Sequence, residues 1–306
     1  MKKITKTKKI TTVLLITMLI CGLLAGCGGG GNGVYDNGDG NGDSGSSFIY
    51  SFDISVISRE DGSGTRGAFI ELFGVEVRED DGSRKDMTTK EAIIANRTDV
   101  MMTSVASDPY AIGYISLGSL NDSVKALEID GVAATVANVK SGSYGISRPF
   151  NIATKGEPTG LAKDFIDFIM SAEGQAVVAA SYIAVDDGLP AFSGGDATGR
   201  IVIAGSSSVT PVMEKLVEAY EKINPDARIE IQMSDSSAGM NGTIDGICDI
   251  GMASRGLRDS ELEQLTGLMI ALDGIAVIVN NGNPIAGLSA EEVRAIFTGE
   301  IIDWEL

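Results

Sequence analysis

Three serine- and threonine-rich turns carry the side chains in this sequence that are best suited to holding a small anion. Each turn follows a short apolar run and opens a helical pattern: residues 59–65 (REDGSGT), 205–211 (GSSSVTP) and 234–239 (SDSSAG). Hydroxyl and backbone N–H groups donate hydrogen bonds, and a helix N-terminus adds partial positive charge. One such turn would indicate only a helix cap. Three of them, one with Arg59, predict a site for a small oxyanion.

A competing motif overlaps the first turn. Residues 62–67 (GSGTRG) fit the pattern G-x-G-x-x-G, which binds dinucleotides when it follows a strand and opens a helix. Such a fold places an acidic residue at the end of the next strand, about 20 residues further on. Residues 78–86 (REDDGSRKD) form a charged turn there instead, so the oxyanion interpretation is favoured.

The composition excludes several classes of function. The chain has 306 residues, with 24 Lys and Arg against 42 Asp and Glu, and it has no histidine. Catalytic sets that need histidine and histidine-ligated zinc are therefore excluded. A net charge of −18 argues against a nucleic-acid binder, which needs a basic face. Nothing in the sequence supplies a convincing pair of nucleophile and base either, so we expect no enzyme activity, no cofactor and no metal site.

The first 26 residues are typical of a signal peptide. Five lysines precede the apolar stretch 13–20, and Leu24-Ala25-Gly26-Cys27 resembles a bacterial lipobox, in which the cysteine is lipidated. Cleavage before Cys27 would leave 19 basic and 42 acidic residues, a net charge of −23. Residues 27–47 are rich in Gly, Asn, Asp and Ser and predict a flexible tether. Cys248 would remain as a small buried residue, without a disulfide partner in the mature monomer.

The elements that must position the three turns alternate between strands and helices. The pattern predicts strands at residues 54–58, 111–117, 124–132, 201–205, 228–233 and 274–280. It predicts helices at residues 65–73, 160–180, 210–224 and 291–299. This alternation indicates an α/β fold with largely parallel sheets. A Gly-, Asp-, Pro- and Ser-rich break at residues 186–199 divides the folded region.

Five longer runs carry a resemblance to a known family. They are residues 58–69, 144–175, 205–232, 236–255 and 271–284. Together they resemble the phosphate-binding lipoproteins of bacterial ABC importers, and the resemblance extends from about residue 52 to 304. It implies a type II periplasmic-binding-protein fold, in which two α/β lobes close by a hinge over phosphate in a central cleft.

The resemblance also implies which residues bind phosphate. Lobe I would contribute Ser208, the Val209 amide and Ser236, and lobe II would contribute Arg59, Ser63, Gly64 and Thr65, with Asp61 organising the loop.

One position departs from the family pattern. Some members carry an Asp after the run that matches residues 250–253, where it accepts the phosphate proton and pairs with the Arg. This sequence has Ser254 there. A hydroxyl still accepts a hydrogen bond, but it does not repel fully ionised sulfate as a carboxylate does. The sequence therefore leaves open how the protein would select phosphate over sulfate.

The segments occur in an unusual order for the family, which indicates a circular permutation. The usual chain begins at the equivalent of residue 201, whereas here that segment follows the break at residues 186–199. Lobe I would then be the continuous stretch 147–278, and lobe II would combine residues 48–146 with 279–306. A truncated tandem array, or a chain completed by a second copy, would give the same motif order.

We therefore expect a lipid-anchored protein outside the cytoplasm that delivers inorganic phosphate to the membrane subunits of an ABC permease. Two alternatives remain open: an enzyme that acts on phosphate esters or nucleotides, and a surface sensor or adhesin that uses the same fold. We expect no nucleic-acid partner.

Overall fold

The computed structural model describes residues 47–79, 83–186 and 188–306. The predicted signal peptide, the Cys27 lipidation site and all but the last residue of the predicted tether lie outside the described residues. The part from Ser47 to Leu306 forms one unit.

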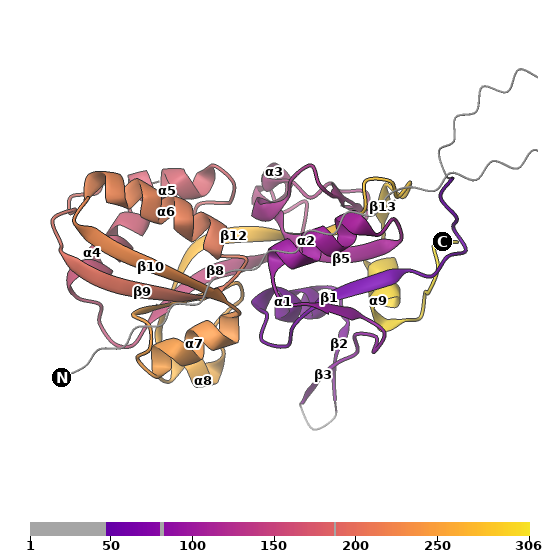
Figure 1. Ribbon diagram of the computed structural model, residues 1–306, viewed down its shortest axis with the longest axis horizontal. Coiled ribbons are helices and arrows are strands. Elements are labelled where there is room, and N and C mark those ends of the chain that lie inside the picture. The colour runs from indigo at the N-terminus through magenta and orange to yellow at the C-terminus, as the bar shows by residue number, and fades with distance from the viewer. Residues whose placement is uncertain (1–46, 80–82, 187) are drawn as a thin grey trace, which may run out of the picture. The chain divides into compact units, whose positions relative to one another are not determined.

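One sheet organises the described residues (Figure 1). Its strands follow the order β10-β9-β11-β8-β12-β5-β1-β4, and β6 pairs with β12 as a ninth strand among the residues described. The strands are β1 (Ser55–Arg59), β4 (Ile93–Ala95), β5 (Ala111–Ser116), β6 (Lys125–Ala126), β8 (Ser147–Thr154), β9 (Gly199–Ser206), β10 (Ala227–Ser234), β11 (Ile250–Ala253) and β12 (Thr266–Val279). Helices alternate with these strands along the chain, which confirms the predicted α/β class.

Strand β12 passes from one half of the sheet to the other. Its first part, through Gly274, pairs antiparallel with β8, and its last part, from Ile275, pairs antiparallel with β5. Parallel strands flank this antiparallel centre on both sides: β10 and β11 beside β9, and β4 and β5 beside β1. The expectation of largely parallel sheets therefore holds for both ends of the sheet, while β8 and β12 between them are antiparallel to their neighbours.

Lobe I surrounds β8, β9, β10, β11 and the first part of β12. Its helices are α4 (Gly160–Ile169), α5 (Ala172–Ala179), α6 (Thr210–Ile223), α7 (Ser236–Ile244) and α8 (Asp259–Leu262). Apolar side chains of α4, α5 and α6 form the main core on one face of the sheet, and Met240 of α7 packs in a smaller cluster. Figure 1 shows α5 and α6 on one side of β9 and β10 and α7 on the other.

Lobe II surrounds β1, β4, β5 and the last part of β12. Its helices are α1 (Gly64–Leu72), α2 (Thr98–Ser107), α3 (Val136–Lys140), α9 (Ala290–Thr298) and the 3-10 turn η1 (Leu117–Ser119). Two small strand pairs complete it, namely β2 (Glu76–Arg78) with β3 (Arg84–Asp86) and β7 (Glu128–Ile129) with β13 (Gly287–Leu288). Ile275 and Ile278 lie in the core of this lobe, so the two cores divide earlier along β12 than the expected boundary after residue 278.

Two predicted elements differ from the observed ones. The helix expected at residues 160–180 is interrupted, because Ser171 ends α4 and caps α5 by accepting a hydrogen bond from Gly174 N at 3.2 Å. The strand expected at residues 124–132 is reduced to β6 and β7, since Asp130 adopts a positive φ of 51° and turns the chain. The apolar periodicity of both segments is continuous, so it gave no sign of either break.

Candidate functional site

Three strands end at the same place in the molecule and each continues into a helix N-terminus. They are β1 leading to α1, β9 leading to α6 and β10 leading to α7. The turns after them are in contact: Ser237 N donates to Gly62 O at 3.3 Å between the lobes, and Ser207 N donates to Ser234 O at 3.0 Å within lobe I. The three turns singled out in the sequence therefore lie together, with their N–H groups and hydroxyls at one junction.

Buried hydroxyl groups from both lobes meet directly at this junction. Thr65 Oγ1 of α1 lies 2.7 Å from Ser208 Oγ of lobe I. Thr98 Oγ1, at the start of α2, lies 3.3 Å from Ser207 Oγ and 3.4 Å from Ser208 Oγ. All four side chains are buried. A hydroxyl both donates and accepts, so this cluster can turn its O–H groups toward a ligand oxygen.

Arg59 lies beside the hydroxyl cluster, with only 2% of its surface exposed. Its guanidinium donates to Ser207 Oγ at 3.0 Å and to Thr98 Oγ1 at 3.4 Å. It also forms a two-point ion pair with Glu60, with distances of 2.8 Å and 2.7 Å. Charge-assisted contacts of this kind fix the guanidinium firmly. The arginine thus contributes directed N–H groups to the cluster, while Glu60 balances its charge.

Tyr114 holds the end of β1 in place. Its hydroxyl lies 2.9 Å from Ser58 Oγ and accepts a hydrogen bond from Arg59 N at 3.1 Å. Burial raises the pKa of Tyr114, so the phenol stays neutral near pH 7. The backbone that carries Arg59 is therefore fixed by a buried neutral side chain.

A second group of serines lies deeper in lobe I. Ser206 Oγ donates to Ser254 Oγ at 2.9 Å, and Ser254 N donates to Ser236 Oγ at 3.1 Å. The exposed fractions of Ser254 and Ser236 are both 0%. These contacts join the ends of β9 and β11 to the start of α7. Ser254 therefore belongs to the same polar junction as the predicted turns.

Two glycines make the close approach of these turns possible. A Cβ atom on Gly64 would lie 2.5 Å from Ser236 Oγ and 2.8 Å from Ser254 Oγ, across the junction between the lobes. A Cβ on Gly205 would lie 2.4 Å from Met252 O, and Gly205 also has a φ of +133°. A larger residue at either position would push the serine-rich turns apart.

Three predicted residues already have partners of their own. The Asp61 side chain is 96% exposed and forms an ion pair with Arg66 at 2.9 Å, so it points away from the hydroxyl cluster. Ser63 is buried and accepts a hydrogen bond from Arg66 N at 3.3 Å as the cap of α1. The Val209 amide donates to Ser206 O at 3.0 Å within its own turn.

Sequence reasoning missed four residues of the junction: Glu60, Thr98, Ser206 and Ser207. Ser206 and Ser207 lie in the turn at residues 205–211, which the sequence analysis had already singled out, so that turn could have pointed to both residues. Thr98 follows β4 and opens α2, which is a fourth strand-to-helix turn of the same kind with a single hydroxyl residue. Its proximity to Arg59 results from the parallel pairing of β1 with β4.

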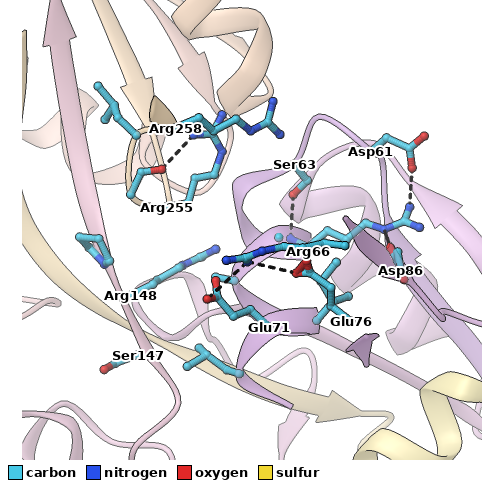
Figure 2. A pocket seen from close by; sticks show the side chains of 18 of the residues that line it. Asp61, Ser63, Arg66, Glu71, Glu76, Asp86, Ser147, Arg148, Arg255 and Arg258 are labelled. Atoms are coloured by element: carbon cyan, nitrogen blue, oxygen red, sulfur yellow. Dashed lines mark hydrogen bonds and ion pairs between the residues drawn. The ribbon is translucent and has the colours of Figure 1, made fainter. Parts of the chain in front are cut away.

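A groove of about 820 Å³ adjoins the junction (Figure 2). One wall comes from lobe II, including Ser63 and Arg66, and the other comes from lobe I, including Arg148 and Arg255. Ser63 belongs both to the groove and to the turn that carries Thr65. The groove and the hydroxyl cluster are therefore neighbours on either side of one turn.

A buried ion pair joins β8 and β12 at the lobe I wall of the groove. Arg148 of β8 and Asp273 of β12 are register partners, with Nη2 and Oδ2 3.3 Å apart and exposed fractions of 2% and 1%. Burial raises the pKa of Asp273 to about 6, although Arg148 acts against this rise. Burial likewise lowers the pKa of Arg148 to about 10. Both shifts favour the neutral forms, so the loss of water outweighs the attraction between the two charges.

The described residues hold no group of three or more His, Cys, Asp or Glu side chains placed to bind a metal ion. Cys248 is buried and lies 3.3 Å from Thr243 Oγ1. Within the described part of the chain, no helix is both long enough and apolar enough to cross a membrane.

Comparisons with known proteins point in one direction. A family model described as a PBP superfamily domain matches residues 50–173 and 192–306. A protein of Streptococcus agalactiae named phosphate-binding protein PstS 2 is 50% identical over 98% of both chains. The protein of the same name from Streptococcus pneumoniae is 45% identical over 82% of this chain and 87% of its own length.

A solved structure gives the same result. The phosphate-binding protein of a phosphate ABC transporter from Streptococcus pneumoniae has a TM-score of 0.66 and 45% sequence identity. The match covers 83% of this chain and 98% of that chain. The two-lobed periplasmic-binding-protein fold expected from the sequence is thereby confirmed, whereas the permuted order of its segments stays a prediction.

Proposed function

Because the chain belongs to the PBP superfamily, and within it to the family of PstS phosphate-binding proteins, we propose that it binds inorganic phosphate and delivers it to an ABC importer. The observation that supports this most directly is the buried junction of hydroxyls and Arg59 between the lobes. A phosphate ion offers up to four oxygens as acceptors, and the junction offers O–H and N–H donors from three turns. Phosphate would therefore replace part of the present network of contacts between hydroxyls.

The residues proposed to hold phosphate come from both lobes. They are Arg59, Ser63, Gly64, Thr65 and Thr98 from lobe II, and Ser207, Ser208, Val209, Ser236 and Ser254 from lobe I. Asp61 would act through Arg66, which its carboxylate contacts. Since neither lobe holds all the donors, phosphate would be gripped fully only when the lobes are together.

An acidic protein can hold an anion in this way. Hydroxyls, helix N-termini and Arg59 act at contact distance, whereas surface charges are screened within about 10 Å at ordinary salt. The phosphate site also lacks a histidine, because the sequence has none. The donors of the site therefore keep their protonation across the neutral range.

We further propose that the protein works outside the cytoplasm and is held at the membrane by a lipid on Cys27. The basic and apolar segments before Leu24-Ala25-Gly26-Cys27 support this, as does the predicted tether at residues 27–47. The partner would be the membrane subunits of the importer. Metabolic labelling with a fatty acid, lost in a Cys27→Ala variant, tests the anchor.

Isothermal titration calorimetry tests the binding function. We expect phosphate to bind with one tight site, and Thr65→Ala and Ser208→Ala each to weaken it at least about tenfold, because each removes a buried hydroxyl and leaves its partner unpaired. Thr103→Ala, which removes an exposed hydroxyl on α2, is the control and should bind like the wild type. Absence of heat on phosphate addition to the wild-type protein would overturn the proposal.

A further inference from the structure

The groove beside the phosphate junction contains more arginine than the proposed function uses. Five arginines line it, from both lobes: Arg66, Arg84, Arg148, Arg255 and Arg258. Its volume of about 820 Å³ is far larger than a single phosphate ion needs. Apart from Asp61, Ser63 and Arg66, the residues that line it have no role in the proposed phosphate site.

The lobe II wall of the groove is electrically balanced. Arg66 forms ion pairs with Asp61 and Asp86, at 2.9 Å and 2.8 Å. Arg84 lies 3.6 Å from Glu71 and 3.4 Å from Glu76. Each arginine on this wall therefore has two carboxylates, and an added anion would gain little there.

The lobe I wall offers N–H groups that lack an acceptor. Arg148 uses Nη2 for Asp273, but its Nε and Nη1 are buried without a hydrogen-bond partner among the described residues. Arg255 pairs with Glu261 through both terminal nitrogens, at 2.8 Å and 2.7 Å, while its Nε is also buried without a partner there. Arg258 is exposed and acts on the Glu261 carboxylate without an ion-pair contact among the described residues, and the neighbouring Asp259 also lines the groove. A buried donor without an acceptor is costly, and an anion would remove that cost.

The three side chains face the same space. Figure 2 shows Arg148, Arg255 and Arg258 on the lobe I side of the groove, opposite Arg66. Arg255 also lies against the junction, because a Cβ on Gly64 would be 3.1 Å from its Cγ. An anion among these arginines would therefore be adjacent to the turn that carries Thr65.

We propose that Arg148, Arg255 and Arg258 form a second, outer oxyanion site in this groove. The ligand is a phosphoryl oxyanion, since a tetrahedral group presents several acceptors to guanidinium donors that point from different directions. Two sources supply this chemistry: a second orthophosphate ion, or the far phosphoryl group of a condensed phosphate whose near group occupies the hydroxyl junction. The proposal extends the proposed function, because it assumes that the junction is the inner phosphate site.

The experiment is calorimetric titration of the full folded protein with orthophosphate and, separately, with pyrophosphate. If the outer site takes a free ion, we expect two orthophosphate ions per chain, of which the second is weaker and loses affinity as salt rises, because Arg258 is exposed. If it takes a condensed phosphate, we expect one pyrophosphate per chain, bound through both sites. Either result supports the proposal.

Variants assign the sites. Arg258→Gln should weaken the outer binding about tenfold, which is the usual scale for one charge-assisted contact, and leave the inner orthophosphate affinity unchanged. Arg228→Gln removes an exposed arginine of the same lobe outside the groove and is the control. Arg148→Lys keeps the hinge charge but removes the unpartnered Nε and Nη1, so it should also weaken the outer site.

The outcomes separate this proposal from the proposed function. Thr65→Ala should weaken inner binding at least about tenfold and leave unchanged the weak, salt-dependent site that Arg258→Gln weakens. One orthophosphate per chain, with neither ligand affected by Arg258→Gln, would overturn the outer site while leaving the inner one in place. Equal losses in Arg258→Gln and Arg228→Gln would also overturn it, because they would show a general effect of charge. Absence of tight orthophosphate binding would instead contradict the proposed function.

Discussion

Ser254 is the residue on which the selectivity of the proposed site depends. It ends β11, it is fully buried, and its neighbours Ser206 and Ser236 are also hydroxyl residues. A hydroxyl accepts the proton of a hydrogen phosphate and equally donates to a sulfate oxygen. The wild-type site therefore lacks a carboxylate at this position to repel fully ionised sulfate.

Replacing Ser254 with Asp should sharpen the choice between the two anions. A buried carboxylate would repel sulfate but accept a hydrogen bond from protonated phosphate, so we expect sulfate affinity to fall at least about tenfold more than phosphate affinity. Competition calorimetry at pH 7 measures both, with Ser254→Asn as the neutral control and circular dichroism as the check of folding. Equal losses for both anions in the Asp variant would contradict this expectation.

The Asp273 carboxyl makes a second, testable contribution at the scale of single residues. Its pKa is about 6 in the folded protein, above the ordinary value of 3.8, so the folded state binds more protons between these two values. Stability contributed by this group is therefore fully present below about pH 4 and is lost as the pH rises through about 6. The loss is at most about 3 kcal/mol, from a shift of about two pKa units.

Urea denaturation at several pH values between 4 and 7 measures this effect. We expect the wild type to lose stability relative to Asp273→Asn as the pH rises through this window, because the amide does not ionise. At pH 4 the wild-type Asp273 is protonated, so Arg148 lacks a partner charge in both proteins, and the difference in stability between them should grow as the pH rises. The informative quantity is the difference in slope, and parallel curves for the two proteins would contradict the prediction.

Among the elements, the break between α4 and α5 has the clearest physical cause. Ser171 Oγ donates to Phe168 O at 2.7 Å and accepts from Gly174 N at 3.2 Å, so one side chain ends α4 and starts α5. A Cβ on Gly174 would lie 2.1 Å from Phe168 O. The second helix therefore packs closely against the end of the first.

Two substitutions test the break between α4 and α5. Ser171→Ala should lower the free energy of unfolding by about 1 kcal/mol, the usual cost of a lost cap. Gly174→Ala should cost more than that, because the added methyl group clashes with backbone that cannot move without disturbing α4. Urea denaturation measures both values, and Ser181→Ala, at a half-buried position after α5, is the control. A Gly174→Ala variant as stable as the wild type would show that the break tolerates a side chain.

The difference between local sequence patterns and contacts between distant segments explains which site residues the sequence could predict. Strand-to-helix turns are local patterns, so the three that carry Thr65, Ser208 and Ser236 were recognisable from composition and periodicity. Thr98 joins them through strand pairing, and Glu60 joins through the direction of the Arg59 side chain. Neither relationship is visible in a linear pattern. The outward position of Asp61 likewise results from its pairing with Arg66, which no spacing rule describes.

At the scale of the whole molecule, the first and last described segments of the folded unit run side by side. Trp304 N donates to Tyr50 O at 2.8 Å, and Ile54 N donates to Ile302 O at 2.7 Å. In the segment order usual for the family, these two segments would be consecutive in the chain. Their proximity supports our proposal that the order is circularly permuted, because it costs little to connect segments that already pair.

A rearranged chain tests this proposal. It would begin at Gly199, run to Leu306, continue through a short Gly/Ser linker to Ser47 and end at Asp186. We expect it to fold and to bind phosphate within about twofold of the wild type, because only exposed connections change. A second rearranged chain, opened between Gly274 and Ile275 inside β12, is the control and should not fold. Failure of the first chain to fold would contradict the permuted order.

Strand β12 has a consequence for how the two lobes come apart. Its 14 residues supply hydrogen-bond partners to β8 in one core and to β5 in the other. Melting either core would expose part of a strand that the other core still needs, so neither lobe can unfold and leave its neighbour intact. Heating should therefore produce one calorimetric transition, and a protease should find no stable half-molecule to release.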